Sequence, residues 1–128
     1  MHMNPSAPRI LLVEDRSDLA AMYKLAFQLE GFETKIASSG SEGVAEAMSG
    51  WPQLIVLDVQ LPDFDGFAVF EAIRMRDINV PVIFLTVTED PASMQRAIDQ
   101  GALDYLVKPR VKPAEIVQRI RHHLADHV

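Results

Sequence analysis

The segment ILLVED at residues 10–15 runs from four apolar residues straight into two carboxylates. Further along the chain the same pattern returns, an apolar run of strand length that ends at a polar residue: LIVLD at residues 54–58, PVIFLT at residues 81–86 and YLVKP at residues 105–109. Helix-like stretches separate these runs, so the strands are expected to be parallel, and open α/β sheets bind ligands outside the carboxyl ends of such strands. The sequence therefore predicts one pocket that collects the residues ending the runs, which are Glu14, Asp15, Asp58, Thr86 and Lys108.

The stretches between the runs carry apolar residues at helical spacing, with capping residues, glycine or proline near their ends. Helices are expected over Leu19–Leu29, after Ser39, around Val69–Ile73, after Asp90 and from Pro113 onward, and one more short strand is expected at Thr34–Ala37. Five strands then alternate strictly with five helices. This alternation predicts an α/β fold built from βαβ units, with right-handed crossovers and helices on both faces of a parallel sheet.

The last two expected helices each carry an apolar face. In the first of them this face is formed by Met94, Ala97 and Ile98. In the second it is the stripe Ile116, Val117, Ile120 and Leu124, and the same spacing leaves Arg119, His122 and His123 outside.

Length and charge narrow the function classes. A chain of 128 residues with 48% hydrophobic residues suffices for one domain with a core, expected at residues 9–126. The net charge of -6 argues against a nucleic-acid surface or an anionic membrane as partner. The absence of cysteine suits a reducing cytoplasm. Residues 1–8 contain no apolar core of a signal peptide and are expected to form a flexible leader or an expression scar.

Convergence of Glu14, Asp15 and Asp58 would create a strongly acidic pocket. Two carboxylates about 4 Å apart repel by roughly 4 kcal/mol at an effective dielectric constant of 20. Lys108 offsets one charge, and the remaining excess matches Mg²⁺, which keeps several waters and completes its shell with phosphate oxygens. The pocket is therefore interpreted as a phosphoryl site in which Asp58, alone after an apolar strand, is the nucleophile. An aspartyl phosphate hydrolyses readily and suits a reversible signal.

These residues make the chain resemble the receiver domain of two-component response regulators, over about residues 9–125. The resemblance implies a three-layer, flavodoxin-like (βα)5 fold with a five-stranded parallel sheet in the order 2-1-3-4-5. It implies that Asp58 accepts phosphate from a histidine kinase or phosphotransfer protein. The expected Mg²⁺ set is Glu14, Asp15, Asp58 and Gln60. The only catalysis expected is the domain's own phosphorylation and dephosphorylation.

The resemblance also implies a switch. Thr86 and Lys108 would contact the phosphoryl oxygens, Pro109 would follow a cis bond, and the ring of Tyr105 would turn inward when Thr86 moves. The surface formed by the fourth helix, the fifth strand and the fifth helix would then change partners, acting on a downstream effector or forming a homodimer.

Several residues depart from the family pattern or modulate access. Glu14 stands where aspartate is commoner, Val87 where a small residue is usual, and Arg110 where an aromatic residue is frequent. Gln60 and Thr88 flank the path of an attacking water. The branched Val87 predicts slower labelling by small phosphodonors than in a Val87→Ala variant.

Three other functions are compatible with parts of this pattern. A magnesium-dependent phosphatase with an aspartyl nucleophile is disfavoured, because Asp58-Val59-Gln60 lacks a second carboxylate two residues on and the chain has no cap insertion. A nucleotide or flavin module would need a glycine-rich turn after the first strand, where Glu14 and Asp15 stand instead. A degenerate receiver that binds partners without phosphate remains open because of Glu14 and Val87.

Overall fold

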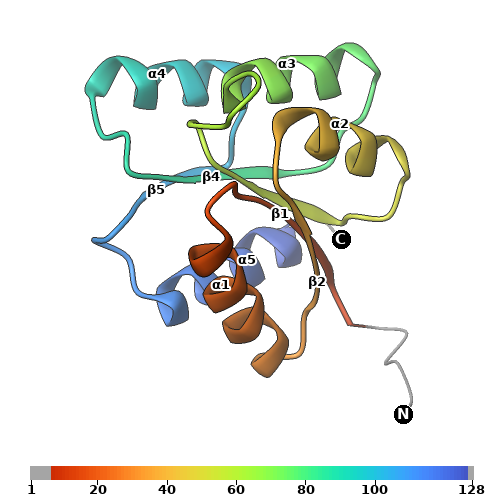
Figure 1. Ribbon diagram of the computed structural model, residues 1–128, viewed down its shortest axis with the longest axis vertical. Helices are drawn as coiled ribbons and strands as arrows, with labels where there is room; N and C mark the ends of the chain where they lie inside the picture. The colour runs from red at the N-terminus through yellow and green to blue at the C-terminus, as the bar shows by residue number, and fades with distance from the viewer. Residues whose placement is uncertain (1–6, 127–128) are drawn as a thin grey trace.

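Strands and helices alternate throughout residues 7–126, the part of the chain that the computed structural model describes (Figure 1). The elements are β1 (Arg9–Val13), α1 (Ser17–Leu29), β2 (Glu33–Ala37), α2 (Gly40–Met48), β3 (Leu54–Leu57), α3 (Gly66–Met75), β4 (Val82–Thr86), α4 (Pro91–Gln100), β5 (Asp104–Val107) and α5 (Pro113–Asp126). Every element predicted from the sequence is present. No end of a strand differs from the predicted one by more than one residue.

The sheet is parallel and has the strand order β2-β1-β3-β4-β5, which confirms the order implied by the resemblance. Val13 of β1 pairs with Leu57 of β3, and Thr86 of β4 pairs with Val107 of β5. The residues that follow these positions therefore lie along one edge of the sheet, as the apolar runs predicted.

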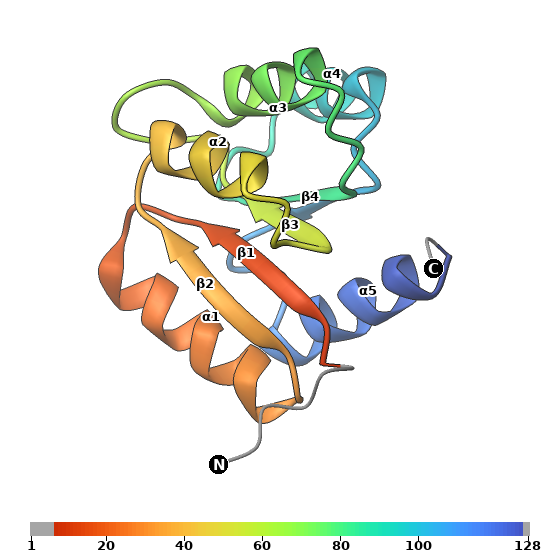
Figure 2. The ribbon, with the colours of Figure 1, turned by 90° about the vertical axis from the view of Figure 1, so that its right-hand side faces the viewer.

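The helices form two layers, with α1 and α5 on one face of the sheet and α2, α3 and α4 on the other (Figures 1 and 2). Alternating side chains of each central strand divide between two hydrophobic clusters. In β1, Ile10 and Leu12 join the cluster under α1 and α5, whereas Leu11 and Val13 join the cluster under the other layer. Because both faces are covered, the central strands are apolar throughout, as in other buried parallel sheets.

The helix on the edge of the second layer, α4, differs from its prediction. Its spacing is helical, but Ala97 is its buried residue, and Met94 and Ile98 are 37% and 60% exposed. The apolar face predicted from Met94, Ala97 and Ile98 thus lies largely in solvent. The helix covers the border of the sheet, where it has α3 as a neighbour on one side.

The predicted exposure of His123 is wrong. Its side chain is 13% exposed, and its Nε2 lies 3.0 Å from Oδ2 of Asp104 at the start of β5. His122 and Arg119 are exposed, as predicted. One of the two neighbouring histidines at the end of α5 therefore contacts a carboxylate that stands 19 residues earlier in the sequence.

Residues near the chain start contact the edge of the sheet at which the strands begin. Ala7 is buried, and the carbonyl of Pro8 accepts a hydrogen bond from the amide of Glu33. Residues 1–6 of the expected leader lie outside the described residues. Trp51 lies at this edge, since its carbonyl accepts a 2.7 Å hydrogen bond from Nε of Arg9, the first residue of β1. No helix in residues 7–126 has the length and apolar character to cross a membrane.

Candidate functional site

Three carboxylates converge where β1 and β3 end. Glu14, Asp15 and Asp58 each offer a carboxylate oxygen, and these oxygens lie within 4.8 Å of one another. Glu14 and Asp58 are buried, at 2% and 6% exposed, while Asp15 is exposed. The convergence predicted from the apolar runs is confirmed, because β1 and β3 are neighbours in register.

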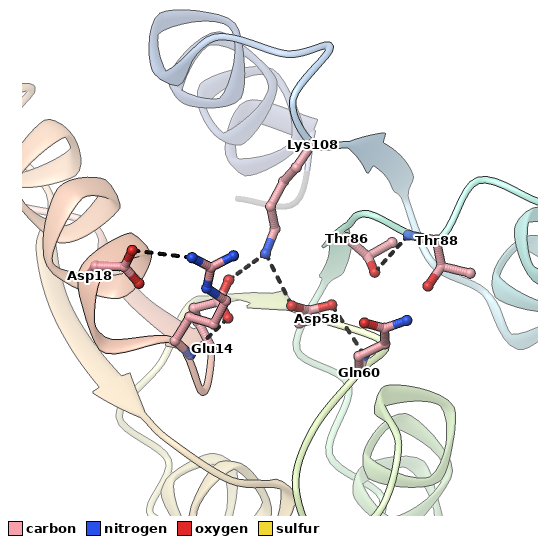
Figure 3. A network of polar contacts seen from close by, with 8 residues as sticks. Glu14, Asp18, Asp58, Gln60, Thr86, Thr88 and Lys108 are labelled. Carbon is pink, nitrogen blue, oxygen red and sulfur yellow. Dashed lines mark hydrogen bonds and ion pairs between the residues drawn. The ribbon is translucent and has the colours of Figure 1, made fainter.

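Lys108 enters this cluster from the end of β5. Its Nζ donates a 3.0 Å hydrogen bond to Oδ2 of Asp58 and a short hydrogen bond to Oε1 of Glu14 (Figure 3). Burial by itself lowers the pKa of Lys108, but the hydrogen bond to Glu14 and the charge of Asp58 outweigh this effect, so the pKa is raised. The ammonium group therefore stays protonated and balances part of the buried negative charge.

The cluster keeps an excess of negative charge. Three carboxylates face one ammonium group, which leaves a formal charge of about two negative units if all are ionised. The donor set consists of carboxylate oxygens, and two of the three carboxylates, Asp15 and Asp58, line an open cavity of about 260 Å³. Hard oxygen ligands with room for water fit a divalent cation such as Mg²⁺.

Asp58 is fixed by the loop that follows it. The amide of Gln60 donates a 3.2 Å hydrogen bond to Oδ1 of Asp58. The amide of Gly66, the first residue of α3, donates a 2.8 Å hydrogen bond to the carbonyl of Val59. A Cβ atom at Gly66 would lie 2.2 Å from the carbonyl oxygen of Asp58, so only glycine permits this approach.

Thr86 ends β4, and Tyr105 lies on the neighbouring strand β5. Thr86 is fully buried, and its Oγ1 accepts a 3.3 Å hydrogen bond from the amide of Thr88 (Figure 3). The hydroxyl of Tyr105 donates to the carbonyl of Thr88. Burial, together with the charges of Asp90 and Asp58, raises the pKa of Tyr105 to about 12. The phenol is thus linked to the loop that follows Thr86.

Two of the residues expected to control access, Gln60 and Val87, line the cavity, whereas Thr88 is not among its lining residues. Val87 is 53% exposed and lines the cavity together with Asp58 and Gln60. The bond between Lys108 and Pro109 is cis, as expected. The side chain of Arg110 forms an ion pair with Glu89 at 3.1 Å on the protein surface.

The sequence reasoning missed Arg16, which lies at the site, and Asp63, which lies next to it in the loop after Asp58. The amide of Arg16 donates a 3.1 Å hydrogen bond to Oε2 of Glu14, and Arg16 lines the cavity. Asp63 binds the start of α2 from the loop after Asp58. Arg16 could have been identified from its position directly after the two carboxylates. Asp63 has no comparable feature in the sequence, where it is one of several turn-forming residues.

Comparison with known proteins agrees with this geometry. A family model described as "Response regulator receiver domain" matches residues 10–121. The chain belongs to this family. The receiver domain is 39% identical over 121 residues to the transcriptional regulatory protein PrrA of Mycobacterium leprae, covering 94% of this chain and 52% of PrrA. It is 35% identical over 122 residues to the DNA-binding response regulator MtrA of Mycolicibacterium smegmatis, covering 95% of this chain and 53% of MtrA.

A solved structure shows the same architecture. The CheY-like response regulator receiver domain protein from Methanospirillum hungatei superimposes with a TM-score of 0.87 at 28% identity, covering 94% of this chain and 96% of that protein. The receiver domain spans about half the length of the curated relatives it matches. Its class of function is phosphorylation-controlled signalling rather than metabolic catalysis, and the alternatives of a phosphatase and of a receiver that acts without phosphate are not favoured.

Proposed function

We propose that Asp58 accepts a phosphoryl group from a histidine kinase or phosphotransfer protein, in a reaction that depends on Mg²⁺. The observation that carries this proposal is the convergence of Glu14, Asp15, Asp58 and Lys108. All of them except the buried Glu14 line an open cavity. An acidic cluster with one buried lysine has the charge and the ligands that phosphoryl transfer requires. The domain in this proposal comprises residues 9–126.

Each residue has a role in the transfer. One oxygen of Asp58 forms a bond to phosphorus while the bond between phosphorus and the donor nitrogen breaks, and the imidazole leaves with the electron pair and takes up a proton. Glu14, Asp15, Asp58 and Gln60 would hold a Mg²⁺ ion, which would supply positive charge to neutralise the phosphoryl oxygens. Lys108, now paired with Asp58 at 3.0 Å, moves its hydrogen bond to a phosphoryl oxygen.

The transfer acts as a switch through Thr86 and Tyr105. The hydroxyl of Thr86 turns toward the new phosphoryl oxygens and thereby pulls on the loop that Tyr105 binds through the carbonyl of Thr88. The surface of α4, β5 and α5 changes as a result and binds an effector or a second copy of the domain. The net charge of -6 argues against direct binding of nucleic acid by this chain. The absence of cysteine fits a cytoplasmic location.

Intact-mass spectrometry tests the phosphoryl acceptor. With acetyl phosphate and Mg²⁺, the wild-type domain is expected to gain one phosphate, and Asp58→Asn to gain none. Asp65→Asn is the matched control, since it removes an exposed carboxylate from the same loop and should be labelled normally. An adduct that persists in Asp58→Asn would rule out Asp58 as the acceptor.

A second comparison tests access to the acceptor. Val87 lines the cavity of Asp58, so its removal in Val87→Ala is expected to speed labelling by acetyl phosphate, measured by the same mass analysis. Equal rates in the two proteins would show that Val87 does not restrict the donor. Absence of labelling in both, with Mg²⁺ present, would point to a receiver that binds partners without phosphate.

A further inference from the structure

The loop of residues 59–65 joins the phosphoryl site to a helix that takes no part in it. Oδ1 of Asp63 accepts a 2.7 Å hydrogen bond from the amide of Gly40, and Oδ2 accepts a 2.9 Å hydrogen bond from the amide of Ser41. These are the first two amides of α2, which have no partner within their own helix. Asp63 thus binds residues of α2 that stand 22 and 23 positions earlier in the sequence.

A second carboxylate of the same loop behaves differently. Asp65 accepts a 2.9 Å hydrogen bond from the amide of Ala68 and caps α3, the helix that it precedes. Its contact is local, whereas that of Asp63 crosses to another element. The two aspartates therefore differ in reach while sharing residue type, loop and exposure.

The start of α2 is shaped to receive Asp63. A Cβ atom at Gly40 would lie 3.0 Å from Oδ1 of Asp63 and 3.0 Å from the ring of Phe64. The helix already has its own cap, because Oγ of Ser39 accepts a 3.2 Å hydrogen bond from the amide of Glu42. The hydrogen bonds from Ser41 and Gly40 hold the pKa of Asp63 well below its usual range, so the carboxylate stays ionised.

The same loop forms a wall of the phosphoryl site. Gln60, Leu61 and Pro62 line the cavity of about 260 Å³ that contains Asp58. The loop closes at its base, where the amide of Gly66 donates to the carbonyl of Val59 at 2.8 Å. Its far side is held by Asp63, the residue next to this wall, so the position of the wall depends on α2.

We propose that Asp63 is a positioning residue for the phosphoryl site, fixing the wall formed by Gln60, Leu61 and Pro62 by binding the start of α2. The proposal rests on the function proposed for Asp58. Linkage requires the reverse effect as well, since a group bound at Asp58 that depends on the wall must also strengthen the contact between Asp63 and α2.

Labelling kinetics provide the first test, with Asp63→Ala compared against Asp65→Ala. The rate of labelling by acetyl phosphate with Mg²⁺ is measured across donor concentrations, so that the limiting rate and the half-saturating concentration are separated. A displaced wall is expected to lower the limiting rate of Asp63→Ala roughly tenfold or more, because misplacement on the order of 1 Å can reduce rates about a hundredfold. Asp65→Ala is expected to keep the wild-type limiting rate.

Gly40→Ala disturbs the same contact from the side of α2. It is expected to slow labelling as Asp63→Ala does, and the double variant should be no slower than Asp63→Ala alone, because both changes remove one interaction. Additive slowing would show two separate effects and overturn the proposal. Equal slowing in Asp63→Ala and Asp65→Ala would do the same, since it would trace the loss to general destabilisation of the loop.

Amide hydrogen exchange, followed by NMR without phosphodonor or metal, gives a readout independent of labelling. Asp63→Ala is expected to speed exchange at Gln60 as well as at Gly40 and Ser41, whereas Asp65→Ala should leave Gln60 unchanged. Unchanged exchange at Gln60 in Asp63→Ala would overturn the proposal. If the wild type itself is not labelled, the function proposed for Asp58 fails, and the exchange of Gln60 still decides the role of Asp63 in placing the wall.

Discussion

The helices α4 and α5 lie on opposite faces of the sheet near β5 and are held in different ways. Helix α5 buries Ile116, Val117 and Ile120 in the hydrophobic cluster that it shares with α1. Helix α4 buries Ala97 and leaves Ile98 60% exposed. Burial of a large aliphatic side chain contributes about 1.5–3 kcal/mol to stability. The packing of α5 on the sheet is therefore stabilised by apolar burial that α4 lacks.

Polar and aromatic contacts hold α4 instead. The guanidinium of Arg96 lies 4.4 Å above the ring of Phe67, and Nε2 of Gln100 donates a 3.1 Å hydrogen bond to the carbonyl of Phe67. The ring of Phe67 lies 5.2 Å from that of Phe84, which lies 5.9 Å from that of Tyr105. A helix held by such contacts can shift at small cost, which makes α4 rather than α5 the element expected to respond to a charge at Asp58.

Truncation of one isoleucine in each helix is expected to give the largest difference in stability between α4 and α5. Ile120→Ala is expected to lower the free energy of unfolding by roughly 2–5 kcal/mol, because it leaves a cavity in the core. Ile98→Ala should change it by no more than about 0.5 kcal/mol. Urea unfolding followed by circular dichroism measures both. Similar losses in the two variants would show that α4 is anchored as firmly as α5.

Removal of the Tyr105 hydroxyl tests the contact between β5 and the loop before α4. Tyr105→Phe is expected to lower the free energy of unfolding by about 0.5–1.5 kcal/mol, because the carbonyl of Thr88 loses its donor. The pKa of Tyr105 is raised to about 12, so its contribution is complete below the unfolded value of about 10 and is lost as the pH rises through about 12. Urea unfolding of both proteins at pH 8 and above pH 10 measures this. A difference between them that stayed constant to the highest pH would contradict the assignment.

The contact between Arg96 and Phe67 is expected to stabilise α4 and to have no effect on α5. Arg96→Ala is expected to lower the free energy of unfolding by about 0.5–1 kcal/mol. Amide hydrogen exchange should become faster along α4 and stay unchanged along α5. Arg121→Ala, which removes an arginine 5.2 Å from the ring of Phe32, is the matched control on α5. Faster exchange in α4 of that control would show that the two helices are coupled.

Acid should loosen α4 through its cap. Hydrogen bonds from the hydroxyl and amide of Ser93 lower the pKa of Asp90. Its contribution is therefore present above the unfolded value of about 3.9 and is lost as the pH falls through the lower folded value. Exchange at the first turn of α4, corrected for intrinsic rates, is expected to rise below pH 4 in the wild type and to change less with pH in Asp90→Asn. Identical pH profiles would show that the cap contributes nothing.

The strands and the centre of the site were predictable from the sequence. Continuous apolar runs of three to five residues indicate buried strands, and parallel strands align their carboxyl ends. This reasoning predicts from the sequence alone that Glu14, Asp58 and Lys108 lie together. The strand order rested on the resemblance, because spacing alone does not decide which buried strand neighbours which.

Contacts that depend on how helices cross the sheet were not predictable. Helical spacing identified the apolar face of α4 but not that this helix lies over the border of the sheet, where Met94 and Ile98 stay exposed. The inward position of His123 depends on Asp104, and the reach of Asp63 depends on Gly40. Side-chain pairs of this kind follow from the packed structure and leave no periodic signal in the sequence.

The approach of Gly66 to the carbonyl of Asp58 bears on how variation is tolerated. A Cβ atom 2.2 Å from that oxygen is incompatible with this backbone, so every substitution at Gly66 requires the turn to be rebuilt. Asp58 can be exchanged for asparagine with little change of shape. A mutational library sorted for folded protein should thus retain changes at Asp58 and discard those at Gly66. A second sort for phosphate labelling should discard both, which separates a residue that builds the domain from the proposed phosphoryl acceptor.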